Sequence, residues 1–245
     1  GELCLLGPNV GDFNIEAEGD LNFRLGKRDS ATLVVRANIQ NQRPTYLLRN
    51  YRNAYIHWDN NDLSRQFRTS LQGEIGYSRT RTKLRFGWNN LTNYTYLAMQ
   101  NTLKPGAKEG SIVPADYTHS VAVRQSDASV QVFTASLSQD LIWKFIGWEN
   151  EITFQHSTNQ DVLPLPAINI YSNLYLQFRI AKVLRVQLGG DIRFFTGYYA
   201  PDYFGAAGMF AVQDASHTRM TIGKYPIVNV YANLHLKRTR FFIMM

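Results

Sequence analysis

Residues 12–25 read DFNIEAEGDLNFRL, and apolar or small residues alternate with polar ones along this stretch. The first set is Phe13, Ile15, Ala17, Gly19, Leu21, Phe23 and Leu25, and the second is Asn14, Glu16, Glu18, Asp20, Asn22 and Arg24. Successive side chains of a β-strand point to opposite faces, so the stretch predicts a strand with one apolar and one charged face. A membrane-crossing strand takes roughly 9–11 residues, against about 5–6 in ordinary soluble strands. The predicted strand is therefore long enough to cross a membrane.

The same alternation recurs along the chain, and the connections between its stretches have two sizes. Alternating stretches cover residues 31–40, 67–77, 82–89, 173–180, 184–194 and 228–237, and further strands are expected near 54–58, 94–99, 117–124, 130–143 and 149–155. Short turns fall at 26–29, 79–80 and 181–182, and long loops at 41–53, 101–116, 157–166 and 196–216. Transmembrane barrels combine short turns at one rim with long loops at the other. The sequence therefore predicts an all-β fold, an antiparallel transmembrane β-barrel meander with roughly twelve strands and no helix.

Two local irregularities carry expectations of their own. The alternation breaks phase at residues 138–140, which predicts a β-bulge. Gly189 and Gly190 fall inside a strand rather than between a strand and a helix. They predict close packing or a kink, not a phosphate-binding loop.

Length and composition agree with a single domain over residues 1–245. The chain is 44% hydrophobic and 18% charged, without a domain linker or a low-complexity tract. No apolar run approaches the roughly 18 residues of a membrane-spanning helix. Aromatic residues make up 13% of the chain, as the girdles of a membrane barrel would require, although a β-sandwich core also uses many. The single cysteine, Cys4, rules out an intrachain disulfide and disfavours a cysteine-rich metal site.

The formal charge of +7 suggests anionic partners of some kind. No segment concentrates the basic residues as a DNA-binding arm would, so nucleic acid is not an expected partner. The charges fall instead on the polar strand positions. The expected lumen-lining residues are Glu16, Glu18, Arg24, Arg68, Glu74, Lys83, Arg85, Arg179, Arg185, Asp191, Arg193 and His235. In the alternative, a soluble β-sandwich, the same polar faces would point into bulk water.

The carboxyl-terminal third resembles a known family. The matching segments are NLYLQF (173–178), AKVLRVQLGGD (181–191), FTGYYAP (195–201), YPIVNVYAN (225–233) and LKRTRFF (236–242). They resemble the putative porin family of Bacteroides-type bacteria, clearly over residues 170–245 and diffusely before. The resemblance implies a barrel in the outer membrane of a Gram-negative bacterium. Members usually are much longer and continue past the Phe-Phe segment into a last strand, whereas this chain stops at Met245. The chain is therefore expected to be a fragment of a longer member, part of a larger barrel.

Residues with catalytic or metal-binding chemistry are scattered through the chain. Among the five histidines, His57, His119, His156, His217 and His235, none pairs with another at metal-ligand spacing. His119 and Ser120 are neighbours in an expected strand and should point to opposite faces, which disfavours a hydrolase pair. Glu149 and Glu151 share one strand face and are expected to be lumen charges. The sequence thus predicts no catalytic residue, no cofactor-binding site and no metal site.

The leading expectation for function is a porin-like barrel, not an enzyme, that lets small and preferentially anionic solutes pass through a charged lumen. Its expected partners are outer-membrane lipid, small solutes and either further copies of itself or an envelope complex. A plugged structural barrel, a scaffold subunit of an outer-membrane assembly, is the second hypothesis. An outer-membrane hydrolase and a soluble β-sandwich are the remaining two.

Overall fold

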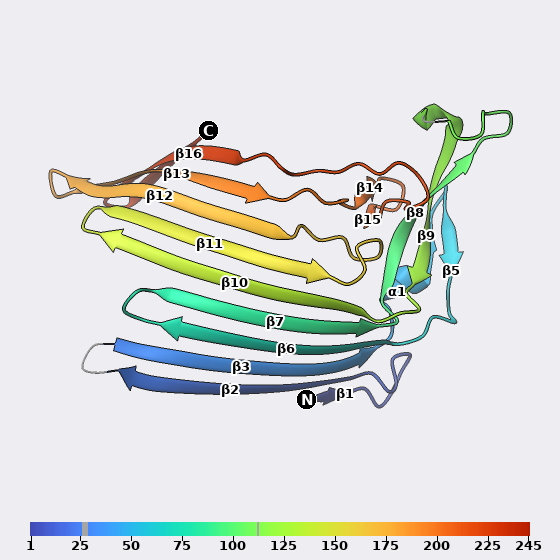
Figure 1. Cartoon of the computed structure of the whole chain (residues 1–245), viewed down its shortest axis with the longest axis horizontal. Coiled ribbons are helices and arrows are strands. Elements are labelled where there is room, and N and C mark those ends of the chain that lie inside the picture. Colours follow the sequence, from blue (N-terminus) through green and yellow to red (C-terminus); the bar gives the residue numbers. More distant parts are fainter. Residues whose placement is uncertain (26–28, 112) are drawn as a thin grey trace.

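The computed structural model describes residues 1–25, 29–111 and 113–245, and its dominant feature is one 11-stranded antiparallel sheet (Figure 1). The strands of this main sheet are β1 (Glu2–Leu3), β2 (Phe13–Leu25), β3 (Asp29–Gln42), β6 (Gln66–Tyr77), β7 (Thr82–Thr92), β10 (Val130–Trp143), β11 (Ile146–Ser157), β12 (Ile168–Ile180), β13 (Leu184–Phe195), β16 (Ile227–Leu236) and β17 (Thr239–Met244). Their order in space follows their order in the chain. The predicted meander is confirmed.

The strand inventory differs from the sequence prediction in detail. The described residues form 17 strands, of which six pair in three separate two-stranded sheets. Strand β17 was not predicted, because it begins within the polar stretch 237–240 and continues into the apolar run 241–244 without alternation. The predicted bulge at 138–140 is wrong: Ser138 pairs with Glu151 and Asp140 with Glu149 in unbroken register. The strand keeps its alternation through these residues. Gln139 therefore lies on the same face of the sheet as the hydrophobic Leu137, opposite Asn150.

Short and long connections separate to opposite ends of the sheet, as predicted (Figure 1). At the short-turn end several turns place non-glycine residues at positive φ, among them Arg81 (52°), Lys144 (48°) and Ala181 (49°). Such φ values suit the tight turns that match the twist of paired strands. In the predicted turn at 26–29, residues 26–28 lie outside the described part of the chain.

The long connections fold into a loop cluster at the other end. It consists of α1 (Tyr46–Arg49), β4 (Asn50–Arg52), β5 (His57–Asp59), β8 (Thr95–Leu103), the 3-10 turn η1 (Pro114–Asp116), β9 (Tyr117–Gln125), β14 (Asp202–Phe204) and β15 (Met209–Ala211). Its core joins Leu97, Val121 and Ala211 from three of these segments. The expectation of no helix was wrong for the one-turn α1, and 41–53 and 196–216 are not plain loops. None of the helices within the described residues is long and apolar enough to span a membrane.

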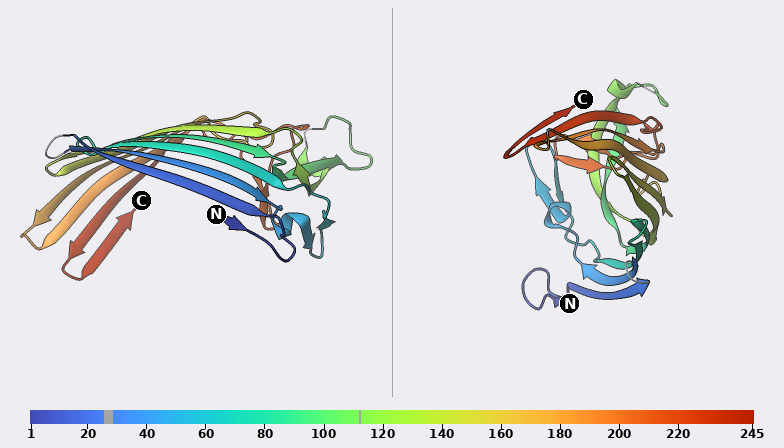
Figure 2. Two further views of the ribbon diagram at one scale, coloured as in Figure 1. Left: turned by 90° about the horizontal axis from the view of Figure 1, so that it is seen from below. Right: turned by 90° about the vertical axis from the view of Figure 1, so that its left-hand side faces the viewer.

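The main sheet is curved like a trough, and the loop cluster lies inside the curve at one end (Figure 2). One face of the sheet carries large hydrophobic side chains that are exposed along its length. We call it the apolar face. Ile15, Leu71, Phe86, Ile152 and Leu174 are 47–56% exposed. A second sheet would have to cover this face in a β-sandwich, and the described residues provide none. The sandwich hypothesis is therefore wrong, and the exposed face is that of a membrane barrel.

Tyrosines on the opposite face pack against strand glycines. A Cβ added at Gly189 would lie 2.6 Å from Cζ of Tyr231, and one at Gly147 would overlap Cζ of Tyr175. Only glycine leaves room for these rings to cross the neighbouring strand. The predicted close packing at Gly189 is confirmed, and the Tyr175 pair was not foreseen.

Candidate functional site

The predicted lumen-lining residues all lie on the face opposite the apolar one, which we call the polar face. The register shows this directly: Glu18 faces Arg36, Glu74 faces Arg85, Asp191 faces Asn229, and the remaining candidates share the same alternation. A space of about 560 Å³ separates this face from the loop cluster. Its lining includes Arg68 and Gln155 from the sheet, and Leu48 and Leu165 from the loops. The polar face is therefore the inner face of the trough (Figure 2).

On the amino-terminal strands, four charges of the polar face form two cross-strand ion pairs. Arg36 Nη2 lies 3.0 Å from Glu18 Oε1, and Arg85 Nε lies 2.8 Å from Glu74 Oε2. Opposite charges on facing strand positions attract each other and hold the side chains in place. Arg36 was not among the predicted candidates, although alternation in residues 31–40 already placed it on the polar side.

A second row combines carboxylates and amides across β11, β12, β13 and β16. Glu149, Asn173, Asp191 and Asn229 face one another in succession. Asn173 Nδ2 donates to Glu149 Oε2 at 3.1 Å, and Asn229 Nδ2 donates to Asp191 Oδ1 at 3.0 Å. Tyr231 donates its hydroxyl proton to Asn173 Oδ1 at 2.9 Å. The amides satisfy the carboxylates, so this row is a rigid polar network rather than an acid–base pair.

A third row is basic and lies at the short-turn end of the carboxyl-terminal strands. Arg179 faces Arg185, Arg185 faces His235, and His235 faces Arg240. We call these four residues the basic row. Among the described residues no carboxylate comes within ion-pair distance of its three arginines, unlike Arg36, Arg85 and Arg193. Arg240 was missed from the sequence because β17 was not predicted.

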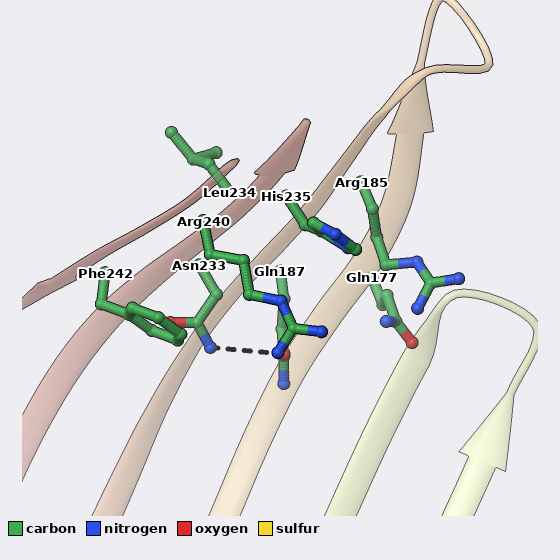
Figure 3. A pocket seen from close by; sticks show the side chains of 8 residues that line it. All are labelled: Gln177, Arg185, Gln187, Asn233, Leu234, His235, Arg240 and Phe242. Atoms are coloured by element: carbon green, nitrogen blue, oxygen red, sulfur yellow. Dashed lines mark hydrogen bonds between the residues drawn. The ribbon is translucent and has the colours of Figure 1, made fainter. Parts of the chain in front are cut away.

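A small pocket lies over this basic row. Its volume is about 190 Å³, and its lining is Gln177, Arg185, Gln187, Asn233, Leu234, His235, Arg240 and Phe242. Figure 3 shows Arg185, His235 and Arg240 on the same side as the amides, while Leu234 points away. Asn233 Nδ2 donates to Gln187 Oε1 at 3.4 Å. The pocket thus offers guanidinium and amide donors next to one aromatic ring.

The candidates for hydrolytic or metal chemistry do not converge. His119 Nδ1 contacts Asn101 Oδ1 at 2.7 Å, whereas the hydroxyl of Ser120 donates to the backbone carbonyl of Gln100 at 3.5 Å. Glu149 and Glu151 face different partners, Asn173 and Tyr171. Throughout the described parts of the chain, no three His, Cys, Asp or Glu side chains gather as a metal site would require.

A Ser-His-Asp group occurs in the loop cluster but lacks catalytic geometry. His217 Nδ1 lies 3.0 Å from both Ser216 Oγ and Asp214 Oδ2. A triad base uses one ring nitrogen for the nucleophile and the other for the acid, so this arrangement cannot relay a proton. Burial raises the pKa of Asp214, but hydrogen bonds from Ser216, Asn101 and His217 outweigh it and hold the pKa below its ordinary value. Its role is to fasten β8 to the loop that follows β15.

Comparison with known proteins agrees with this geometry. The description "Putative porin" belongs to the family that matches the chain over residues 1–245. The chain belongs to the putative porin family. The match includes residues 1–169, where the sequence resemblance was diffuse. Membership of the putative porin family implies an outer-membrane β-barrel and suggests a transport or channel role rather than catalysis. A search of the curated proteins finds no significant match.

One solved structure with a similar fold is the crystal structure of the siderophore receptor PirA from Acinetobacter baumannii. The TM-score is 0.50 at 14% sequence identity, and the alignment covers 91% of this chain. It covers 35% of the receptor chain, so this putative porin chain spans about a third of that length. At this identity the comparison shows a shared fold, in which the main sheet corresponds to part of a barrel wall.

Proposed function

We propose that the intact protein is a channel of the Gram-negative outer membrane that lets small solutes pass passively, with anions favoured. The polar face, with the residues predicted from the sequence, forms the lumen wall, and the apolar face contacts lipid. The supporting observation is the charge on the concave face. Glu18 and Glu74 are paired with arginines, and Glu149 and Asp191 accept hydrogen bonds from amides, whereas the basic row has no acidic partner among the described residues. Such a lumen concentrates anions.

Reversal potentials test this proposal. The full-length protein is placed in a planar lipid bilayer under a potassium chloride gradient. We expect a chloride-to-potassium permeability ratio above unity that falls when Arg179, Arg185 and Arg240 are changed to Gln. Replacing Arg24 and Lys83, basic residues of the polar face on β2 and β7, should lower the ratio less. Cation selectivity, or no conductance at all, would contradict the proposal.

The loop cluster favours a second candidate, a plugged barrel that serves as a scaffold within an envelope assembly. Its three small sheets share a core and lie inside the curve of the main sheet (Figure 2). A folded cluster in that position narrows the mouth at the long-loop end. Absence of conductance together with a stably co-purifying partner or a second copy of the protein would favour this scaffold. For both candidates we propose a transport or structural role rather than catalysis, in keeping with the putative porin family.

A further inference from the structure

We infer that the pocket over the basic row is a binding site for a dissolved phosphate-type oxyanion. The inference extends the proposed anion passage, because it names a class of solute and the place where that solute binds transiently. It rests on the proposed function only for the solute's access to the polar face. Binding itself follows from the geometry of four neighbouring strands.

The first argument is the electrostatic repulsion within the basic row when no ligand is bound. Arg179 and Arg185 occupy directly facing positions, and Arg185, His235 and Arg240 continue the row. Like charges at facing strand positions destabilise a sheet. Elsewhere on the polar face, Glu18 pairs with Arg36 and Glu74 pairs with Arg85. A bound anion would supply the missing negative charge here.

The second argument is the local sequence. The two hairpin ends that carry the row, residues 177–187 and 233–241, contain no Asp or Glu. Their turns add Lys182, Lys237 and Arg238. The positive potential of this corner therefore has no counter-charge from these two hairpin ends, and it extends from the pocket to the short-turn rim.

The third argument is the match between donors and ligand. Guanidinium groups present several N–H donors in a planar fork that suits phosphate and carboxylate oxygens. Arg185 and Arg240 lie on strands flanking the one that carries His235, and the amides of Gln177, Gln187 and Asn233 add neutral donors. A volume of about 190 Å³ accommodates a small oxyanion. The site is open, so we expect a dissociation constant of about 1 mM, which permits rapid release.

The ligand comes from the water of the trough and not from a lipid head group. The pocket's polar side chains lie on the polar face, whereas Leu234, on the same strand as His235, points to the apolar one (Figure 3). A head group would have to leave the apolar side and cross the sheet to reach the guanidinium groups.

Phosphorus NMR of inorganic phosphate tests the inference on the full-length protein in a phosphate-free detergent. We expect saturable line broadening, and we expect the dissociation constant to rise at least about tenfold in the double variant Arg185→Gln/Arg240→Gln. The control Arg24→Gln/Lys83→Gln changes the net charge equally but outside the pocket, and should stay within about twofold of the wild type.

Three results would overturn the inference. They are absence of phosphate binding by the wild type, an equal loss in both double variants, and displacement of phosphate by phosphatidylglycerol in mixed micelles. The measurement needs no ion current, so it separates the two proposals. Phosphate binding without conductance would support the binding site and contradict the proposed channel. Conductance without phosphate binding would support the channel and contradict the binding site.

Discussion

Gly189 shows how much of the polar face depends on single residues. The ring of Tyr231 lies over it, and the Tyr231 hydroxyl reaches across to Asn173, which is buried. Asn173 in turn holds Glu149. A small residue on one strand thereby positions a carboxylate two strands away.

We expect Gly189→Ala to destabilise the barrel by about 1–3 kcal/mol, because the new methyl group displaces Tyr231 and leaves Asn173 without its donor. The control is Gly73→Ala, since a Cβ at Gly73 meets nothing within 4 Å. Urea unfolding in detergent measures the difference. Equal stability of the two variants would show that the tyrosine does not hold the row.

At the scale of residues, the sequence predicted which face of the sheet a side chain lies on better than it predicted the hydrogen-bond or ion-pair partner of that side chain. Alternation alone assigned every candidate from Glu16 to His235 to one side, because the period of a strand is 2. It could not predict that Asn173 binds Glu149, since cross-strand register depends on turns whose lengths are not visible as side-chain patterns. Three of the four residues of the basic row, Arg179, Arg185 and His235, were predicted from the sequence, and Arg240 was not.

At the scale of elements, the long connections are the part of the fold that sequence reasoning described least well. Residues 101–116 were expected to form a loop, but β8 extends to Leu103 and pairs with β9. Val121 and Leu97 then pack with Ala211, which is distant in the chain. Pairings of this kind are tertiary and leave no periodic signal, unlike the alternating strands of the wall.

The hairpin of β8 and β9 provides the largest paired unit of the loop cluster, and its removal tests whether the cluster obstructs the trough. We expect replacement of residues 96–124 by a short Gly-Ser linker to raise single-channel conductance, because pore diameter limits ion flow. Replacement of residues 5–11, which also lie at the long-loop end but do not line the space between the polar face and the cluster, is the control. An unchanged or lower conductance in the hairpin variant would mean that the cluster leaves the passage open.

On the scale of the whole molecule, the structure consists of one wall with two chemically distinct faces. Exposed Ile, Leu and Phe cover one face, and ion pairs, amides and the basic row cover the other. A lipid-exposed sheet must pair all its backbone groups, so a wall of this kind functions within a closed barrel. The sheet described here is open, with β1 and β17 at its two edges. Its family and fold identify it as barrel wall, while solute and selectivity depend on the proposals above.

The central claim is that the apolar face contacts lipid and the polar face contacts water. Cysteine scanning of β2 tests it most directly, in full-length protein reconstituted in vesicles after Cys4 and any cysteine outside residues 1–245 are changed to Ser. A spin label is placed at each position from 13 to 25, and its collisions with oxygen and with a water-soluble nickel complex are compared. We predict a period of 2, with Ile15, Leu21 and Phe23 accessible to oxygen and Glu16 and Asn22 to nickel. Equal access of the nickel complex to both sets would contradict the account.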